Sequence, residues 1–200
     1  MTKQSAVQVV MFLEDIAHEK LLRGFVNRAA TELGVPIQIR VRNATHGSRV
    51  WPELRQTIQA IQKGKDPLPD LFLVAIDANC KGFQTVHHQI EQELEPLSIP
   101  LVCAIPDPHI ERWYLEDLKA WKQILPGAKP QRLSYKCEQD RYKKYLKECI
   151  LAAGVKPALG GAEYGLDLAQ TIDVYQLGKQ DPSFKHFWDE LKSELKRLRF

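Results

Sequence analysis

The 200-residue sequence lacks the phosphate-binding loops of nucleotide-binding proteins. No GxGxxG motif follows an apolar run, and no GxxxxGK followed by Ser or Thr occurs anywhere in the chain. Such glycine-rich loops hold phosphates at the first turn of a helix. Their absence argues against an ordinary Rossmann-like or flavodoxin-like nucleotide binder.

Cysteine is also scarce, and its spacing argues against a zinc finger. The four cysteines form no CxxC pair: Cys80, Cys103, Cys137 and Cys149. No second histidine or cysteine lies four residues from His87, His88 or His109, so solvated or locally bonded histidines are favoured over zinc ligands. We therefore expect reduced thiols in a cytoplasmic protein.

Long hydrophobic runs and strong net charge are missing as well. The N-terminal apolar run is short, meets acidic residues directly and lacks a small-residue cleavage pattern, so we expect neither a membrane span nor a signal peptide. The formal net charge is +3, but residues 129–148 contain seven Lys and Arg against three Asp and Glu, a local +4. The basic character is therefore confined to one window.

The chain does contain three apolar runs of the kind that form buried strands, at residues 7–13, 71–76 and 100–105. Residues 36–41 alternate like a half-exposed strand, and helical patterns separate the runs. This order predicts an α/β fold with a mostly parallel sheet flanked by helices. We expect one domain over 1–200, with an α/β core at 1–125 and a helical C-terminal extension at 126–200.

Two helices in the second half have readable patterns. Ile110, Trp113, Leu118 and Trp121 fall on one side of a predicted helix that follows Asp107-Pro108. The last helix is specified by Asp181 as N-cap and Pro182 in the first turn, and its apolar face follows: Phe184, Phe187, Trp188, Leu191, Leu195 and Leu198.

Polar side chains follow the apolar runs, where an α/β fold binds its ligands. The candidates for one shared site are Glu14, Asp77, Asn79, Asp107 and Glu111. Carboxylate clusters suit magnesium or manganese, which prefer oxygen ligands. The structural alternative is that the acids after the strands cap the following helices, and Glu111 in a first turn is favoured by the helix dipole alone.

These residues together resemble the Toprim fold, and more narrowly the small stand-alone relatives of the overcoming-lysogenization-defect nucleases. In that resemblance Glu14 matches the first acid, Asp77 and Asn79 match the DxD pair, and Glu111 with Trp113 matches the signature helix. The DPSFKHFWDEL segment is similar to the C-terminal helix of the family. The resemblance implies a magnesium-dependent nuclease or nuclease subunit, acting in antiviral defence, with Glu14, Asp77, Asn79 and Glu111 as metal ligands.

The sequence departs from that pattern at two positions. Asn79 supplies an amide in place of the second acid, and His18 stands where relatives have an acid, with Glu19 displaced by one residue. His18 or Glu19 is the candidate proton acceptor. The alternative interpretation is that His18 lies on the surface and has no role in the site. The alternative function is a catalytically degenerate module that binds a partner ATPase. The sequence leaves the oligomeric state open, a homo-oligomer included.

The basic window is the candidate nucleic-acid interface. The window places cations among tyrosines, a combination that suits phosphate neutralisation and base stacking. The predicted nucleic-acid contacts are Arg141, Lys143, Lys144 and Lys147. The alternative is the solvated face of an amphipathic helix, because Tyr142, Tyr145, Leu146 and Cys149 recur at helical spacing.

Overall fold

A computed structural model of the chain describes residues 5–45, 47–138 and 140–199. Its sheet has four parallel strands in the order β2-β1-β3-β4. The strands are β1 (Val7–Leu13), β2 (Ile37–Asn43), β3 (Leu71–Ala75) and β4 (Leu101–Ala104). The predicted α/β fold with a parallel sheet between helices is confirmed.

Helices follow every strand. The first three are α1 (Ile16–Leu33), α2 (Val50–Gln62) and α3 (Phe83–Leu94). The second half contains α4 (Glu111–Leu115), α5 (Leu118–Ile124), α6 (Arg141–Leu151), α7 (Gly165–Thr171), α8 (Val174–Gln180) and α9 (Pro182–Arg197). Short 3-10 turns are η1 (Gly47–Arg49), η2 (Glu95–Leu97) and η3 (Ala162–Tyr164).

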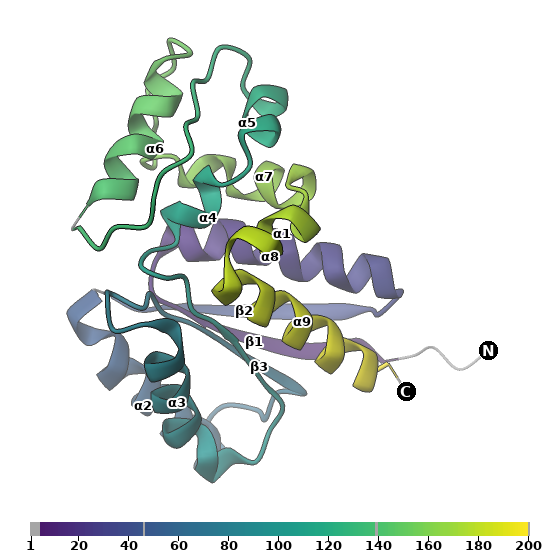
Figure 1. Cartoon of the computed structure of the whole chain (residues 1–200). Coiled ribbons are helices and arrows are strands. Elements are labelled where there is room, and N and C mark those ends of the chain that lie inside the picture. Colours follow the sequence, from purple (N-terminus) through teal and green to yellow (C-terminus); the bar gives the residue numbers. More distant parts are fainter. Residues whose placement is uncertain (1–4, 46, 139, 200) are drawn as a thin grey trace.

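Helices α2 and α3 cover one face of the sheet, α1 and α9 cover the other, and α5, α6 and α7 lie beyond α1 (Figure 1). Alternate residues of β1 point to opposite faces, so Val9 and Met11 join one core while Val10 and Phe12 join the other. The first core contains α1 and the C-terminal helices, and the second contains α2 and α3. Both faces of the strands are therefore covered, as their continuous apolar runs require.

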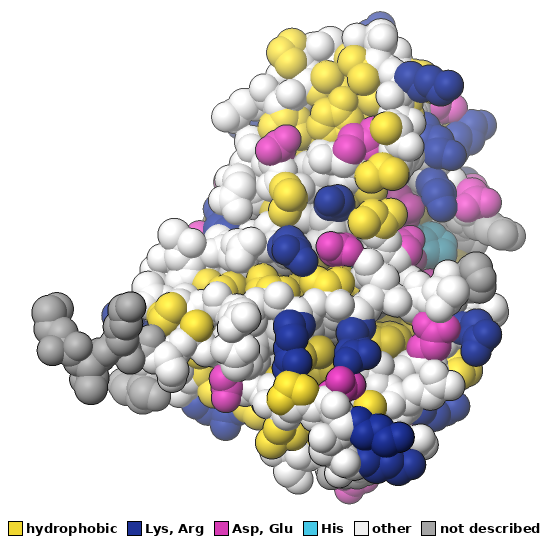
Figure 2. Space-filling view, turned by 180° about the vertical axis from the view of Figure 1, so that it is seen from behind, with side chains coloured by type: hydrophobic (Ala, Val, Ile, Leu, Met, Phe, Trp, Pro, Cys, Tyr) yellow, Lys and Arg dark blue, Asp and Glu magenta, His cyan; other side chains and the backbone are white. Residues whose placement is uncertain are grey.

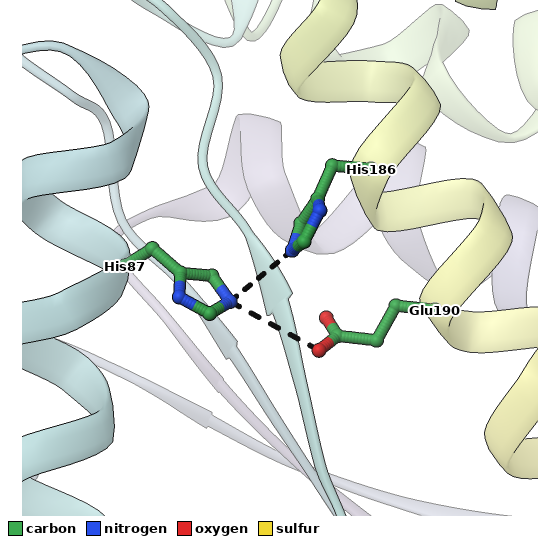
Figure 3. A group of neighbouring side chains, drawn as sticks. All are labelled: His87, His186 and Glu190. Carbon is green, nitrogen blue, oxygen red and sulfur yellow. Dashed lines mark hydrogen bonds and ion pairs between the residues drawn. The ribbon is translucent and has the colours of Figure 1, made fainter.

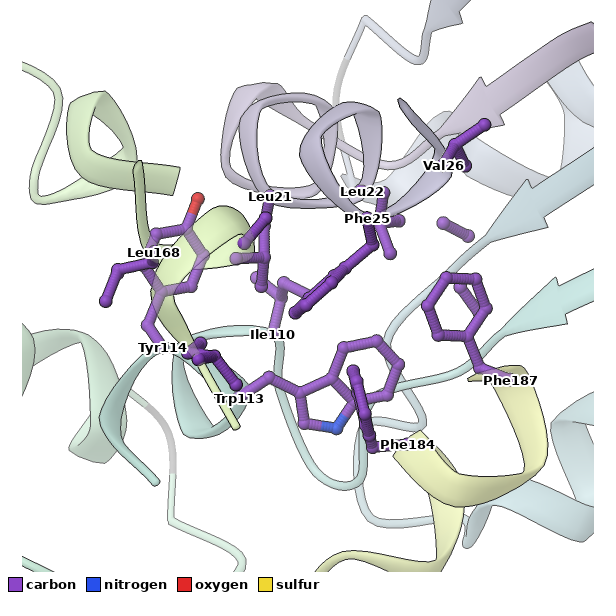
Figure 4. Packing of buried hydrophobic residues seen from close by; sticks show 14 of the residues in the cluster. Leu21, Leu22, Phe25, Val26, Ile110, Trp113, Tyr114, Leu168, Phe184 and Phe187 are labelled. Atoms are coloured by element: carbon purple, nitrogen blue, oxygen red, sulfur yellow. The ribbon is translucent and has the colours of Figure 1, made fainter. Parts of the chain in front are cut away.

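The C-terminal helices are part of the main core. Aromatic side chains of α9 pack against α1 and α4, as Figure 4 shows. The rings of Phe25 and Phe184 lie 5.1 Å apart edge to face, and those of Trp113 and Phe187 stack at 5.6 Å. Asp181 caps α9, as predicted, by accepting a hydrogen bond from the backbone N–H of Phe184. Helix α9 thus completes one face of the sheet beside α1.

The prediction of a single helix after Asp107-Pro108 is wrong. The structure breaks it into α4 and α5, because the side chain of Asp117 accepts hydrogen bonds from the backbone N–H groups of Lys119 and Ala120 and starts a new helix. Trp113 and Trp121 are both buried nevertheless.

The expectation of four reduced thiols is also wrong. Cys80 and Cys137, 57 positions apart in the sequence, form a disulfide, while Cys103 and Cys149 are buried free thiols. Sequence spacing alone could not pair two cysteines in separate loops.

Among the described residues, no helix combines the length and the apolar character that a membrane crossing requires.

Candidate functional site

Glu14 and Asp77 leave the sheet side by side at the carboxyl edge of the strands. Leu13 of β1 pairs with Ala75 of β3, and each acid follows shortly after its strand. After β1 the chain forms β2 on one side of it and then crosses to form β3 on the other side, so the strand order reverses between β1 and β3. Open α/β sheets bind ligands at that point.

Glu14 is not a helix cap. The neighbouring Asp15 caps α1 instead, accepting hydrogen bonds from the backbone N–H groups of Ala17 and His18 at 2.9 and 3.1 Å. One oxygen of Glu14 accepts the backbone N–H of Asp77 at 2.8 Å. Burial and the charge of Asp77 raise the pKa of Glu14 from 4.5 to about 7. The capping alternative therefore does not account for Glu14.

The carboxylate of Asp77 receives three hydrogen-bond donors. Its Oδ1 accepts from Nε2 of His18 at 3.1 Å and from the backbone N–H of Ile110 at 2.8 Å. Its Oδ2 lies 3.3 Å from Nδ1 of His109. Burial alone would raise the pKa of Asp77, but the charge of His18 and these hydrogen bonds lower it. Asp77 is therefore ionised and connects β3 to the start of α4.

His18 is a buried member of the site, so the surface alternative for it is wrong. Its side chain is 1% exposed, and its Nδ1 lies 2.8 Å from Oδ1 of Asp15 while its Nε2 faces Asp77. Burial opposes the charged form, but the charge of Asp77 and the hydrogen bond to Asp15 raise the pKa of His18 well above 6.5. The ring is thus an imidazolium between two carboxylates.

Glu14, His18 and Asp77 each place one ligand-type atom within 4.8 Å of the other two. Glu14, Asp77 and Asn79 also line a small cavity of about 40 Å³. A cavity of this size holds a water molecule or a bare ion but no nucleotide. Oxygen donors around a small cavity fit a hard cation such as magnesium.

Asn79 is held in this cavity by its backbone. It has a positive φ of 46°, and its side-chain amide donates to the backbone oxygen of Asp77 at 3.2 Å. The amide oxygen is the part of this side chain that can ligate a cation.

Glu111 lies close to this group but outside it. Its side chain is buried in the first turn of α4, and burial followed by the charge of Asp77 raises its pKa. Asp107 accepts a hydrogen bond from the hydroxyl of Tyr135 at 3.0 Å. Glu19 accepts a hydrogen bond from Asn43 and pairs with Arg23 at 3.7 Å. Of the predicted acids, the structure brings together Glu14 and Asp77, with Glu111 as a neighbour.

The four predicted nucleic-acid contacts all belong to α6. Lys143, Lys144 and Lys147 are exposed. Arg141 is mostly covered, lying 3.3 Å from Glu138 and over the ring of Tyr145. Figure 2 shows basic side chains at the upper right, where α6 lies after the rotation, with acidic side chains among them.

The disulfide brings α6 toward the carboxylates. Cys80 directly follows Asn79, and Cys137 lies four residues before the first residue of α6. The bond therefore holds the segment before the basic helix at the loop that carries Asp77.

Sequence reasoning missed a second group of ligand-type side chains, formed by His87, His186 and Glu190. His186 and Glu190 are four residues apart on one helix, which was the available signal. Nothing in the sequence indicates that α3 brings His87 to them.

No family model, curated protein or solved structure matches this chain.

Proposed function

We propose that this protein is a magnesium-dependent nuclease, or the nuclease subunit of a complex, built on a Toprim-like fold. The observation that supports this most is the meeting of Glu14 and Asp77 at the strand-order reversal, around a cavity of ion size. Burial, and after it the charge of Asp77, raises the pKa of Glu14, and a divalent cation would relieve the repulsion between the two carboxylates.

In this proposal Glu14, Asp77 and Asn79 hold the cation, and Glu111 supports the site through its charge. A bound magnesium ion supplies charge stabilisation at a phosphodiester and lowers the pKa of water. His18 orients Asp77 through its Nε2 hydrogen bond. The imidazolium has no free lone pair, so His18 would have to give up a proton before it could accept one from water.

The substrate in this proposal is a nucleic-acid strand that lies along α6. Exposed lysines neutralise phosphates, and the disulfide keeps the start of the helix near the carboxylates. DNA and RNA share the phosphodiester, so contacts to phosphate fit both nucleic acids. We include in the proposal a cytoplasmic location and the role in antiviral defence that the resemblance implies.

One observation favours the alternative of a catalytically silent module that docks on an ATPase. Three donors already occupy the carboxylate of Asp77, one of them the cationic His18. An ionised carboxylate has about four lone-pair positions. A cation must therefore displace one of the donors or bind at the lone-pair position that stays free. If His18 serves as a permanent internal cation, the site needs no metal.

Cleavage assays on single-stranded and duplex DNA and RNA, with and without magnesium or manganese, separate the two functions. Asp77→Asn keeps the shape of the side chain and removes its charge, and the exposed Asp167→Asn serves as the control. The nuclease proposal expects metal-dependent cleavage by the wild type and the control but not by Asp77→Asn. Absence of cleavage together with absence of magnesium binding would favour the docking module.

A further inference from the structure

A second group of side chains lies at the free edge of the sheet (Figure 3). His87 comes from α3, and His186 and Glu190 come from successive turns of α9. One ligand-type atom from each lies within 4.8 Å of the other two. Since α3 covers one face of the sheet and α9 the other, the group lies where the two helical layers meet beyond β4.

The donor atoms face one another at distances close to those of a coordination shell. The Nε2 atoms of His87 and His186 are 3.2 Å apart, and Oε1 of Glu190 is 4.0 Å from Nε2 of His87. Two nitrogens bound to one tetrahedral zinc ion at about 2.0–2.1 Å are separated by roughly 3.3–3.4 Å. The nitrogens need almost no movement, and the carboxylate needs a small one.

Contacts behind the donor atoms hold each side chain in this orientation. Nδ1 of His87 lies 3.3 Å from Oε2 of Glu91, a carboxylate–histidine pair of the kind that supports zinc ligands. Oε2 of Glu190 accepts the backbone N–H of Cys103 at 2.8 Å, which leaves Oε1 for the histidines. The ring of His186 packs against Phe83 at 5.8 Å.

We propose that His87, His186 and Glu190 bind one zinc ion, which joins α3 to α9 across the free edge of β4. Two imidazoles and one carboxylate suit zinc, whereas magnesium prefers oxygen ligands alone. The three ligands leave the fourth position to water, on the side of a surface hollow of about 490 Å³ lined in part by Lys185 and Ser193. This site does not depend on the proposed nuclease function.

Zinc affinity of the full chain tests the site. Metal-free protein is titrated with zinc against a chromophoric chelator, using His186→Ala and His87→Ala. His88→Ala is the matched control, because His88 neighbours His87 on α3 and its side chain is 71% exposed. We expect a loss of more than about 100-fold in both test variants, since changes behind the ligands alone cost 10–100-fold. The control should retain wild-type affinity.

Asp77→Asn separates this site from the one at Glu14. Zinc that binds at His87 and His186 should remain in Asp77→Asn, and its loss in that variant would assign the ion to the carboxylate site instead. This comparison stands whether or not the protein cleaves nucleic acid.

Thermal unfolding gives a second measurement. Zinc should raise the Tm of the wild type and of His88→Ala, because a ligand that binds only the folded state stabilises it. The increase should be absent in His186→Ala, whose exposed side chain can be removed with little effect on the metal-free fold. Equal zinc affinities and equal Tm increases in the wild type, His87→Ala and His186→Ala would overturn the proposal.

Discussion

His18 and Asp77 form a partly buried hydrogen bond in which Nε2 and Oδ1 lie 3.1 Å apart. The other ring nitrogen of His18 bonds to Asp15, so one imidazolium joins the loop after β1 to the loop after β3. This ring stabilises the negative charge of the site from within the protein. Any external cation must coexist with it or replace it.

Replacing His18 should therefore destabilise the fold. In His18→Phe, Asp77, whose side chain is only 12% exposed, loses its contact with the imidazolium, and we expect a loss of about 3 kcal/mol in the free energy of unfolding. Chemical denaturation measures it, with the exposed His88→Phe as the control. A loss equal to that of the control would show that the charge of His18 does not matter for stability.

Glu14 gives a pH-dependent prediction. Its pKa in the folded protein is about 7, above the ordinary value of 4.5, because of burial and the charge of Asp77. Protonated Glu14 therefore contributes to the free energy of unfolding of the metal-free protein. This contribution is complete below about pH 4.5 and is lost as the pH rises through about 7. Glu14→Gln should flatten that part of the stability profile.

The same titration should affect magnesium binding with the opposite sign. Protons compete with the cation for Glu14, so affinity should weaken as the pH falls below about 7. Calorimetric titrations from pH 6 to pH 8 would measure this trend. An affinity that is independent of pH would mean that Glu14 is not a ligand.

Gly165 should tolerate alanine poorly. A Cβ there would lie 2.7 Å from the backbone nitrogen of Leu21 and 2.5 Å from the hydroxyl of Tyr114. We expect Gly165→Ala to cost about 1–3 kcal/mol through overpacking between α1 and α7. Gly178→Ala is the control, since its Cβ meets only ordinary contacts at 3.5 Å or more. Similar unfolding free energies for the two variants would contradict this packing.

The lysines of α6 should contribute to nucleic-acid affinity. Lys143→Glu combined with Lys147→Glu should weaken binding and reduce its salt dependence, because each lost phosphate contact changes the slope of log affinity against log salt by about 0.7–0.9. Lys63→Glu with Lys65→Glu, on the exposed loop after α2, is the charge-matched control. Equal effects of the two double variants would remove α6 from the interface.

The buried strands and the last helix could be predicted because their signals are local. The apolar run of β1 and the Asp181-Pro182 start of α9 each specify an element without information from the rest of the chain. The break at Asp117 was missed because the apolar spacing of Trp113 and Trp121 continues across it. A capping side chain outweighed the periodic pattern there.

The site was only partly predictable, because only its local signals can be read from the sequence. Strand ends placed Glu14 and Asp77 at one edge, because parallel strands share their carboxyl edge. The burial of His18 depends on Asp15 and Asp77 together, and the meeting of His87 with His186 depends on how α3 and α9 pack. Such tertiary relationships leave no periodic signal in a single sequence.

The most direct test of the proposed function is the position of manganese in crystals of the full chain soaked with that ion. An anomalous peak between the carboxylates of Glu14 and Asp77 is the result that the account predicts, and the peak should disappear in Asp77→Asn crystals. Crystals that take up manganese only elsewhere, or that keep the His18–Asp77 hydrogen bond with no ion beside it, would contradict the metal-dependent nuclease.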